Sequence, residues 1–119
     1  MSQYQNVHYL NSERIAAYLE QFKNVAPGEK VLEIGKGAGV AGDLIRKIAG
    51  EYKTLDIDES LCPDIAADIT SFESMKQFQN YFDAIHCCQV LEHIPYDQSL
   101  KAIENFFKLA PKKSCIVST

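Results

Sequence analysis

The chain has 119 residues, of which 46% are apolar and 24% are charged, and its net charge is −4. This length suffices for one domain with one hydrophobic core, and the composition excludes a disordered chain. No apolar run approaches the roughly 20 residues of a membrane helix, and the negative charge argues against a broad electrostatic grip on nucleic acid. We therefore expect neither nucleic acid nor a membrane as partner.

The cysteines indicate a reducing environment. Cys62, Cys87, Cys88 and Cys115 show no Cys-x-x-Cys spacing, so we expect reduced thiols and no metal site. The polar N-terminus also lacks the apolar region of a signal peptide. These observations predict a cytoplasmic protein.

An N-terminal helix region is predicted for residues 1–27. Apolar residues follow a helical spacing from Asn11 to Asn24, and Pro27-Gly28 then forms a turn. We expect residues 28–119 to form the core, and residues 1–119 to form a single domain.

A strand, a glycine loop and a helix follow. The apolar run of Lys30–Ile34 reads as a buried strand, and glycines follow it at alternate positions. The helical pattern then runs from about Gly39 to Ala49, with Gly50 as its stop. This arrangement lets a backbone come close to a bound ligand.

The next two predicted strands lie close together in sequence. Tyr52–Ile57 ends in acidic residues, and the short apolar run Ile65–Ala67 ends at Asp68. About eight residues separate them, whereas parallel strands usually need a dozen or more. Either a single turn bridges the two strands or one strand is assigned wrongly, and we favour the turn.

The last third of the chain alternates again between helix and strand. Thr70-x-x-Glu73 is a capping-box pattern that predicts a short helix, and Ala84–Cys88 predicts a strand. Asp97 is expected to cap a helix that ends at Pro111, before a strand over Lys113–Thr119. The expected apolar side of that helix comprises Leu100, Ile103, Phe106, Phe107 and Leu109.

The alternation predicts an α/β fold with a mainly parallel sheet and helices on both faces. Ligands of such sheets bind at the carboxyl ends of the strands. The glycines, Asp56, Asp68 and Gln89 all follow predicted strands. We therefore expect the binding site at that edge.

The glycine loop reads Glu-x-Gly-x-Gly-x-Gly, with Glu33 two residues before Gly35. It fails the dinucleotide fingerprint G-x-G-x-x-G, because Val40 stands at the last position. Asp56 follows Gly35 by 21 residues, and a carboxylate there can accept hydrogen bonds from ribose hydroxyls. The pattern indicates a ligand that carries a nucleoside, and the absence of Gly-Lys-Ser/Thr argues against a P-loop.

Four stretches together resemble the class I S-adenosylmethionine-dependent methyltransferases. They are Val31-Leu-Glu-Ile-Gly-Lys-Gly-Ala-Gly39, Thr54-Leu-Asp-Ile-Asp58, Ala67-Asp-Ile69 and Phe82-Asp-Ala-Ile-His-Cys-Cys-Gln-Val-Leu-Glu-His-Ile94. A weaker similarity covers Phe107–Ser118. The resemblance implies a Rossmann-like three-layer sandwich with a five-stranded sheet in the order 3-2-1-4-5, which lacks the family's usual last two strands.

The resemblance also implies roles for individual residues. The glycine loop would lie under the methionine part of S-adenosylmethionine, and Gln89 would face the methionine end. Glu33 would either orient the loop or meet the ammonium group through water. Asp56 would bind the ribose hydroxyls, and Ile57 would pack on the adenine. Asp68 would accept from the adenine amino group, helped by the backbone N–H of Ile69. The loop residues concerned are Gly35, Lys36, Gly37 and Gly39.

No catalytic residue is assigned. A sulfonium methyl group is already electrophilic, so the protein chiefly supplies alignment and a shielded site. His8, His86 and His93 are each interpreted as structural, because no partner is evident. Asp56 and Asp68 have an alternative interpretation as loop caps, and Glu33 as a strand-end acid that backbone N–H groups satisfy.

The resemblance predicts methyl transfer to an unidentified acceptor, which we expect to be a small molecule, with S-adenosylhomocysteine as the product. The chain ends where the family's core usually continues. It would then be a truncated piece, an incomplete gene product, or a homodimer that covers the exposed fifth strand. Two rival functions remain open: a non-catalytic module that binds S-adenosylmethionine or S-adenosylhomocysteine, and a nicotinamide-dependent oxidoreductase, against which Val40 counts.

Overall fold

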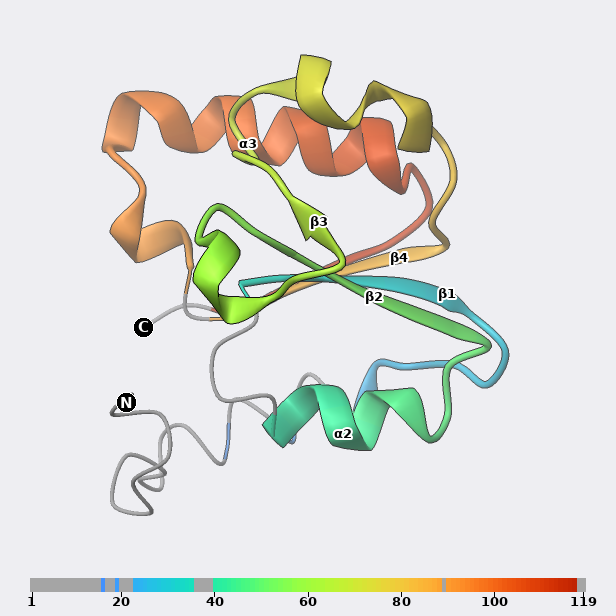
Figure 1. The fold of residues 1–119 in the computed structure, drawn as a ribbon. Coiled ribbons are helices and arrows are strands. Elements are labelled where there is room, and N and C mark those ends of the chain that lie inside the picture. The colour runs from blue at the N-terminus through green and yellow to red at the C-terminus, as the bar shows by residue number, and fades with distance from the viewer. Residues whose placement is uncertain (1–15, 17–18, 20–22, 36–39, 89, 118–119) are drawn as a thin grey trace.

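A computed structural model of the chain describes residues 16, 19, 23–35, 40–88 and 90–117. Its described strands form one parallel sheet in the order β3-β2-β1-β4-β5. Helix α2 covers one face of this sheet, and α3 with the short helix η4 covers the other (Figure 1). The α/β, Rossmann-like architecture with a parallel sheet is therefore confirmed.

The elements follow one another as the alternating pattern predicts. The strands are β1 (Lys30–Ile34), β2 (Glu51–Asp56), β3 (Ile65–Ala66), β4 (Ala84–Cys88) and β5 (Ser114–Val117). The helices are α2 (Val40–Arg46), η3 (Glu59–Leu61), η4 (Phe72–Phe78), η5 (Leu91–His93) and α3 (Tyr96–Leu109), of which those labelled η are 3₁₀ helices. A single 3₁₀ turn, η3, bridges β2 and β3 as expected.

Both faces of the central strands are buried, because helices cover both. On the α3 face, Leu32 and Ile85 belong to the larger apolar cluster. On the α2 face, Val31 and Ala84 belong to the smaller one. Burial on both faces explains why β1 reads as a nearly continuous apolar run.

The helix after the glycine loop ends earlier than predicted. α2 stops at Arg46, not near Ala49. The N–H of Gly50 donates to the carbonyl of Glu29 at 2.8 Å, and a Cβ at Gly50 would lie 2.5 Å from the carbonyl oxygen of Gly28. Gly50 is thus needed where two backbones meet, and its predicted role as the helix stop is wrong.

Two predicted helix caps are also wrong. The N–H and hydroxyl of Thr70 both donate to Asp68, so η4 begins after Ser71 and no capping box forms. α3 begins at Tyr96 after Pro95, which places Asp97 inside the first turn. Pro95 occupies the N-cap position, and its carbonyl accepts the backbone N–H of Gln98 at 2.8 Å.

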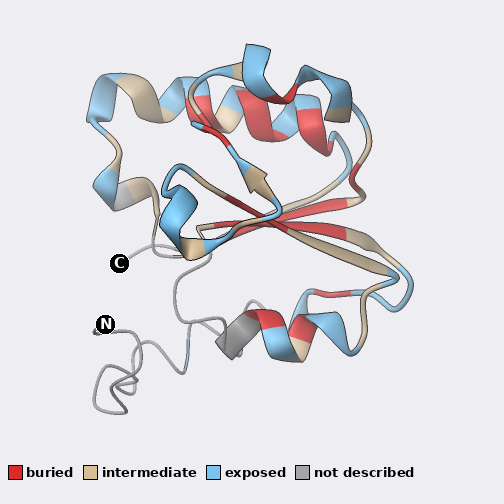
Figure 2. Ribbon diagram, in the orientation of Figure 1, coloured by how far each residue is buried: buried red, intermediate tan, exposed pale blue. Residues whose placement is uncertain are grey.

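The apolar side of α3 differs from the prediction as well. Phe106 and Leu109 are fully buried, but Leu100 is 66% and Phe107 57% exposed. Figure 2 shows buried residues along one side of α3 and exposed ones along the other. The helix therefore has a buried apolar face and a second, exposed apolar stripe.

Most of the helix predicted over residues 11–24 lies outside the described residues. None of the described helices is long and apolar enough to cross a membrane.

Candidate functional site

The carboxyl ends of β1, β2 and β3 meet at one edge of the sheet. Ile34 pairs with Leu55, and Asp56 pairs with Ala66. Two backbone hydrogen bonds continue these ladders past the strand ends, from Gly35 to Leu55 at 2.8 Å and from Ala67 to Asp56 at 3.0 Å. The register thus brings the start of the glycine loop, Asp56 and the segment before Asp68 to one edge.

Gly35 is required by its backbone and by its surroundings. Its φ is +80°, in the region that side chains rarely adopt. A Cβ at this position would also lie 2.5 Å from Cγ2 of Val90, which follows β4. The chain can therefore turn sharply at the end of β1 only with glycine there.

Asp56 and Ile57 lie at the end of β2. The Oδ1 of Asp56 accepts the backbone N–H of Asp58 at 2.9 Å. This hydrogen bond corresponds to the alternative interpretation of Asp56 as a loop cap. Ile57 is 70% exposed. A half-buried carboxylate thus lies next to an exposed apolar side chain.

Asp68 and Ile69 follow β3 with different surroundings. The exposed Asp68 accepts the N–H and the hydroxyl of Thr70 at 2.9 and 2.7 Å, so it also caps its loop. The side chain of Ile69 is buried in the larger apolar cluster. The carbonyl of Ile69 accepts the side-chain amide of Asn105 at 2.7 Å, which fastens this segment to α3.

Glu33 is a buried carboxylate on the α2 face, with 5% exposure. The Tyr52 hydroxyl donates to its Oε1. Burial, and then the charge of Glu33, raise the pKa of Tyr52 far above its ordinary value of 10.0. The phenol therefore stays protonated and keeps donating to the carboxylate.

Four predicted site residues lie outside the described residues. They are Lys36, Gly37, Gly39 and Gln89. Gly35 and the start of α2 bound the loop, and Val90 follows Gln89.

Sequence reasoning missed several residues that shape this edge. Tyr52 holds Glu33, Val90 packs against Gly35, and Asn105 fastens Ile69. Gly42 lies inside α2, where glycine is unfavourable. A glycine at such a position indicates that another group approaches the helix closely. The other three contacts carry no local sequence signal, because they join segments far apart in the chain.

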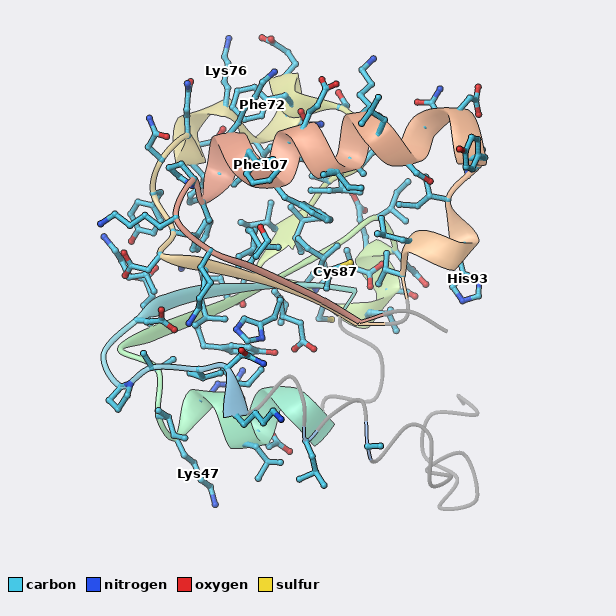
Figure 3. All side chains as sticks on the ribbon, turned by 180° about the vertical axis from the view of Figure 1, so that it is seen from behind. Lys47, Phe72, Lys76, Cys87, His93 and Phe107 are labelled. Carbon is cyan, nitrogen blue, oxygen red and sulfur yellow. The ribbon has the colours of Figure 1, made fainter. Side chains whose placement is uncertain are left out.

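Of the two described histidines, His86 of β4 pairs with Glu33 of β1, whereas His93 lies in η5. His86 is fully buried, and neither ring nitrogen has a hydrogen-bond partner among the described residues. Burial, and then the charge of Lys113, lower the pKa of His86 from 6.5 to about 4. His93 projects outward from η5 (Figure 3). In the described part of the chain, no three His, Cys, Asp or Glu side chains are grouped so that they could hold a metal ion.

The profile of a family described as "Methyltransferase domain" matches residues 5–119. The chain belongs to this methyltransferase family. The resemblance seen in the sequence motifs is therefore confirmed, and it covers nearly the whole chain.

Two curated relatives and one solved structure show the range of this similarity. The chain is 26% identical over 112 residues to the ubiquinone biosynthesis O-methyltransferase of Shewanella sp. strain ANA-3, with 82% of the chain aligned. It is 23% identical over 113 residues to ribosomal RNA small subunit methyltransferase A of Thermotoga maritima, with 92% aligned. The N-methyltransferase NodS of Bradyrhizobium japonicum, solved with S-adenosyl-L-homocysteine, superposes with a TM-score of 0.67 at 21% identity, over 91% of this chain and 64% of NodS.

The chain spans less than half the length of these curated relatives, 46% of the first and 40% of the second. The likeness to NodS shows the shared fold.

Proposed function

We propose that this chain binds S-adenosylmethionine at the carboxyl edge of β1, β2 and β3 and acts in methyl transfer. The observation that carries the proposal is the strand register, which brings Gly35, Asp56 and the segment before Asp68 to one edge. Family membership supports the same cofactor. The single domain over residues 1–119 and the cytoplasmic location remain parts of this proposal.

The residues at this edge fit an amino acid joined to a nucleoside. Gly35 turns the chain where any side chain would meet Val90, which leaves backbone facing the edge. The carboxylate of Asp56 suits ribose hydroxyls, and the exposed Ile57 beside it suits an adenine ring. Asp68 and the backbone N–H of Ile69 would bind the adenine edge.

The remaining proposed contacts concern the methionine part. Gly35, Lys36, Gly37 and Gly39 would lie beneath it, with Gln89 facing it and Glu33 fixing the loop. When bound, the cofactor supplies a methyl group on a sulfonium that needs no further activation. The chain's own work is then to orient the ligand and to exclude water.

We propose a small molecule as the methyl acceptor. The name of the Shewanella relative supports this proposal, and so does the net charge of −4, which disfavours an RNA backbone. The Thermotoga relative is named for ribosomal RNA, which makes RNA the second candidate. Transfer of a labelled methyl group to a pool of small hydroxylated compounds, and not to small ribosomal subunits, is expected.

Calorimetry with S-adenosylmethionine, S-adenosylhomocysteine and NAD tests the cofactor. We expect both sulfur compounds to bind with one site per chain, and NAD to give no heat. Gly37→Val should abolish this binding without unfolding the domain, because a branched side chain would fill the loop. Binding of NAD alone would overturn the proposal, whereas binding without transfer to any acceptor would favour a non-catalytic module.

We also propose a homodimer through β5. This strand is the last in the described sheet on its side, and an unpaired edge can pair with a second chain. On α3, which leads into β5, Tyr96, Leu100 and Phe107 are exposed. Sedimentation should show a dimer for the wild type and dissociation for Leu100→Lys, and a monomeric wild type at high concentration would contradict it.

A further inference from the structure

A hydrogen bond joins two neighbouring strands just below the glycine loop. Glu33 of β1 pairs with Thr54 of β2, so Tyr52 lies two residues earlier on the same face of β2. Its hydroxyl donates to Oε1 of Glu33. A carboxylate with 5% exposure needs such a donor, because burial without one is costly. Tyr52 therefore stabilises the buried charge at the end of β1.

The same tyrosine contacts helix α2 at two successive turns. A Cβ at Gly42 would overlap the Tyr52 hydroxyl and come within 3.3 Å of Oε1 of Glu33. One turn later, the guanidinium of Arg46 lies 4.7 Å from the centre of the Tyr52 ring. Only glycine at position 42 lets the helix approach this closely.

These contacts lie on both sides of the glycine loop in sequence. Glu33 precedes Gly35 by two residues, and Gly42 follows Gly39 by three. We propose that Tyr52 is a positioning residue that fastens both ends of the glycine loop, the end of β1 through Glu33 and the start of α2 through its contact at Gly42. Fixing these two ends favours cofactor binding, a consequence that rests on the proposed function.

The hydroxyl group, and not the ring alone, performs this role. The ring packs against the smaller apolar cluster with Val31 and Ile45, so a purely structural tyrosine would be replaced well by phenylalanine. The raised pKa of Tyr52 keeps its hydroxyl a donor at every pH at which the protein would be used. Tyr52→Phe keeps the packing of the ring and removes only the hydroxyl, so it distinguishes the effect of the hydrogen bond to Glu33 from that of the packing.

Amide hydrogen exchange of the free protein tests the fastening directly. Tyr52→Phe should speed exchange at Gly35 and Gly42 and weaken S-adenosylhomocysteine binding about tenfold. It should also lower the denaturation midpoint, because the buried Glu33 carboxylate loses a donor. Glu33→Gln keeps a carbonyl acceptor for the phenol and should retain more protection than Glu33→Ala. Gly42→Ala, which displaces the hydroxyl, should act in the same direction as Tyr52→Phe.

Tyr81→Phe is the matched control, because the Tyr81 hydroxyl also donates to a carboxylate of β2, that of Glu51 at the amino end of the strand, which lies away from the glycine loop. It should leave the exchange at both glycines and the binding unchanged. Wild-type exchange at Gly35 and Gly42 in Tyr52→Phe would overturn the inference. If the wild type fails to bind S-adenosylhomocysteine, the proposed function falls, while faster exchange in free Tyr52→Phe would still support the fastening.

Discussion

The α3 face of the sheet is packed with apolar side chains, whereas the α2 face carries buried polar groups among a few apolar ones. On the α3 side, Leu32, Leu55, Ile85 and Phe106 belong to one large apolar cluster. The α2 side has a small cluster around Val31, Ile45 and Ala84, and it also holds Glu33, Thr54 and His86. One face thus holds the domain together, and the other positions groups beneath the glycine loop.

A single strand contributes to both faces. In β1, Leu32 and Ile34 point to the α3 side, while Val31 and Glu33 point to the α2 side. A change on one face should therefore leave the other largely intact. This separation leads to predictions of unequal size.

The largest effect is expected on the apolar face. Phe106→Ala should lower the free energy of unfolding by about 3–5 kcal/mol, because it leaves a cavity in a fully buried site. The neighbouring Phe107, 57% exposed, is the matched control, and Phe107→Ala should cost far less. Chemical denaturation of both variants measures the difference. Equal losses would show that the two sides of α3 do not differ as described.

His86, which lies on the α2 face, should make the free energy of unfolding depend on pH. Its pKa is 6.5 unfolded and about 4 folded, so the unfolded chain binds the extra proton first as pH falls. Stability should be constant above pH 6.5 and decline by up to about 3 kcal/mol as the pH falls to about 4.

Denaturation at several pH values checks this, with His86→Leu expected to flatten that part of the profile. An unchanged profile in His86→Leu would assign the dependence to other groups.

Asn105 is the polar exception on the apolar face. Its amide donates to the carbonyl of Ile69 at 2.7 Å. Asn105→Ala leaves that carbonyl without its donor and should cost about 1–3 kcal/mol of unfolding free energy. Lys101→Ala, at an exposed site on the same helix, should stay within about 0.5 kcal/mol. If Asn105→Ala is equally mild, the link between α3 and the segment after β3 contributes little.

A change at Asp56 should affect ligand binding more than stability, whereas a change at Phe106 should affect stability more than binding. Asp56→Ala should weaken S-adenosylhomocysteine binding by about 1–3 kcal/mol, because the ribose hydroxyls lose their acceptor. Its effect on unfolding should be smaller than that of Phe106→Ala, and Phe106→Ala should bind normally while folded. Unchanged affinity in Asp56→Ala would remove this carboxylate from the proposed site.

Sequence reasoning located the strands where both ends carry a clear signal. The bounds of β1 and β4 match the prediction, because an apolar run stops at a loop residue on each side. The sequence pattern did not predict the exposed stripe of α3, because Phe106 and Phe107 are adjacent and equally apolar. Only the packing of α3 against the sheet decides which of the two is buried.

Some features of the candidate site could likewise be predicted from the sequence, and others could not. Gly35, Asp56 and Asp68 could be predicted to share one edge, because parallel strands place their carboxyl ends together. The contact of Tyr52 with Glu33 could not, since it depends on strand register and on the approach of α2 at Gly42. The roles of Gly35, Asp56 and Asp68 in cofactor binding stay predictions.

A crystal structure of the chain with S-adenosylhomocysteine tests the central claim most directly. We predict that the ribose hydroxyls lie within hydrogen-bonding distance of the Asp56 carboxylate, with the adenine against Ile57 and the homocysteine part over the glycine loop. A nucleoside bound away from the shared edge of β1 and β2, or a ribose held by other residues, would contradict the account.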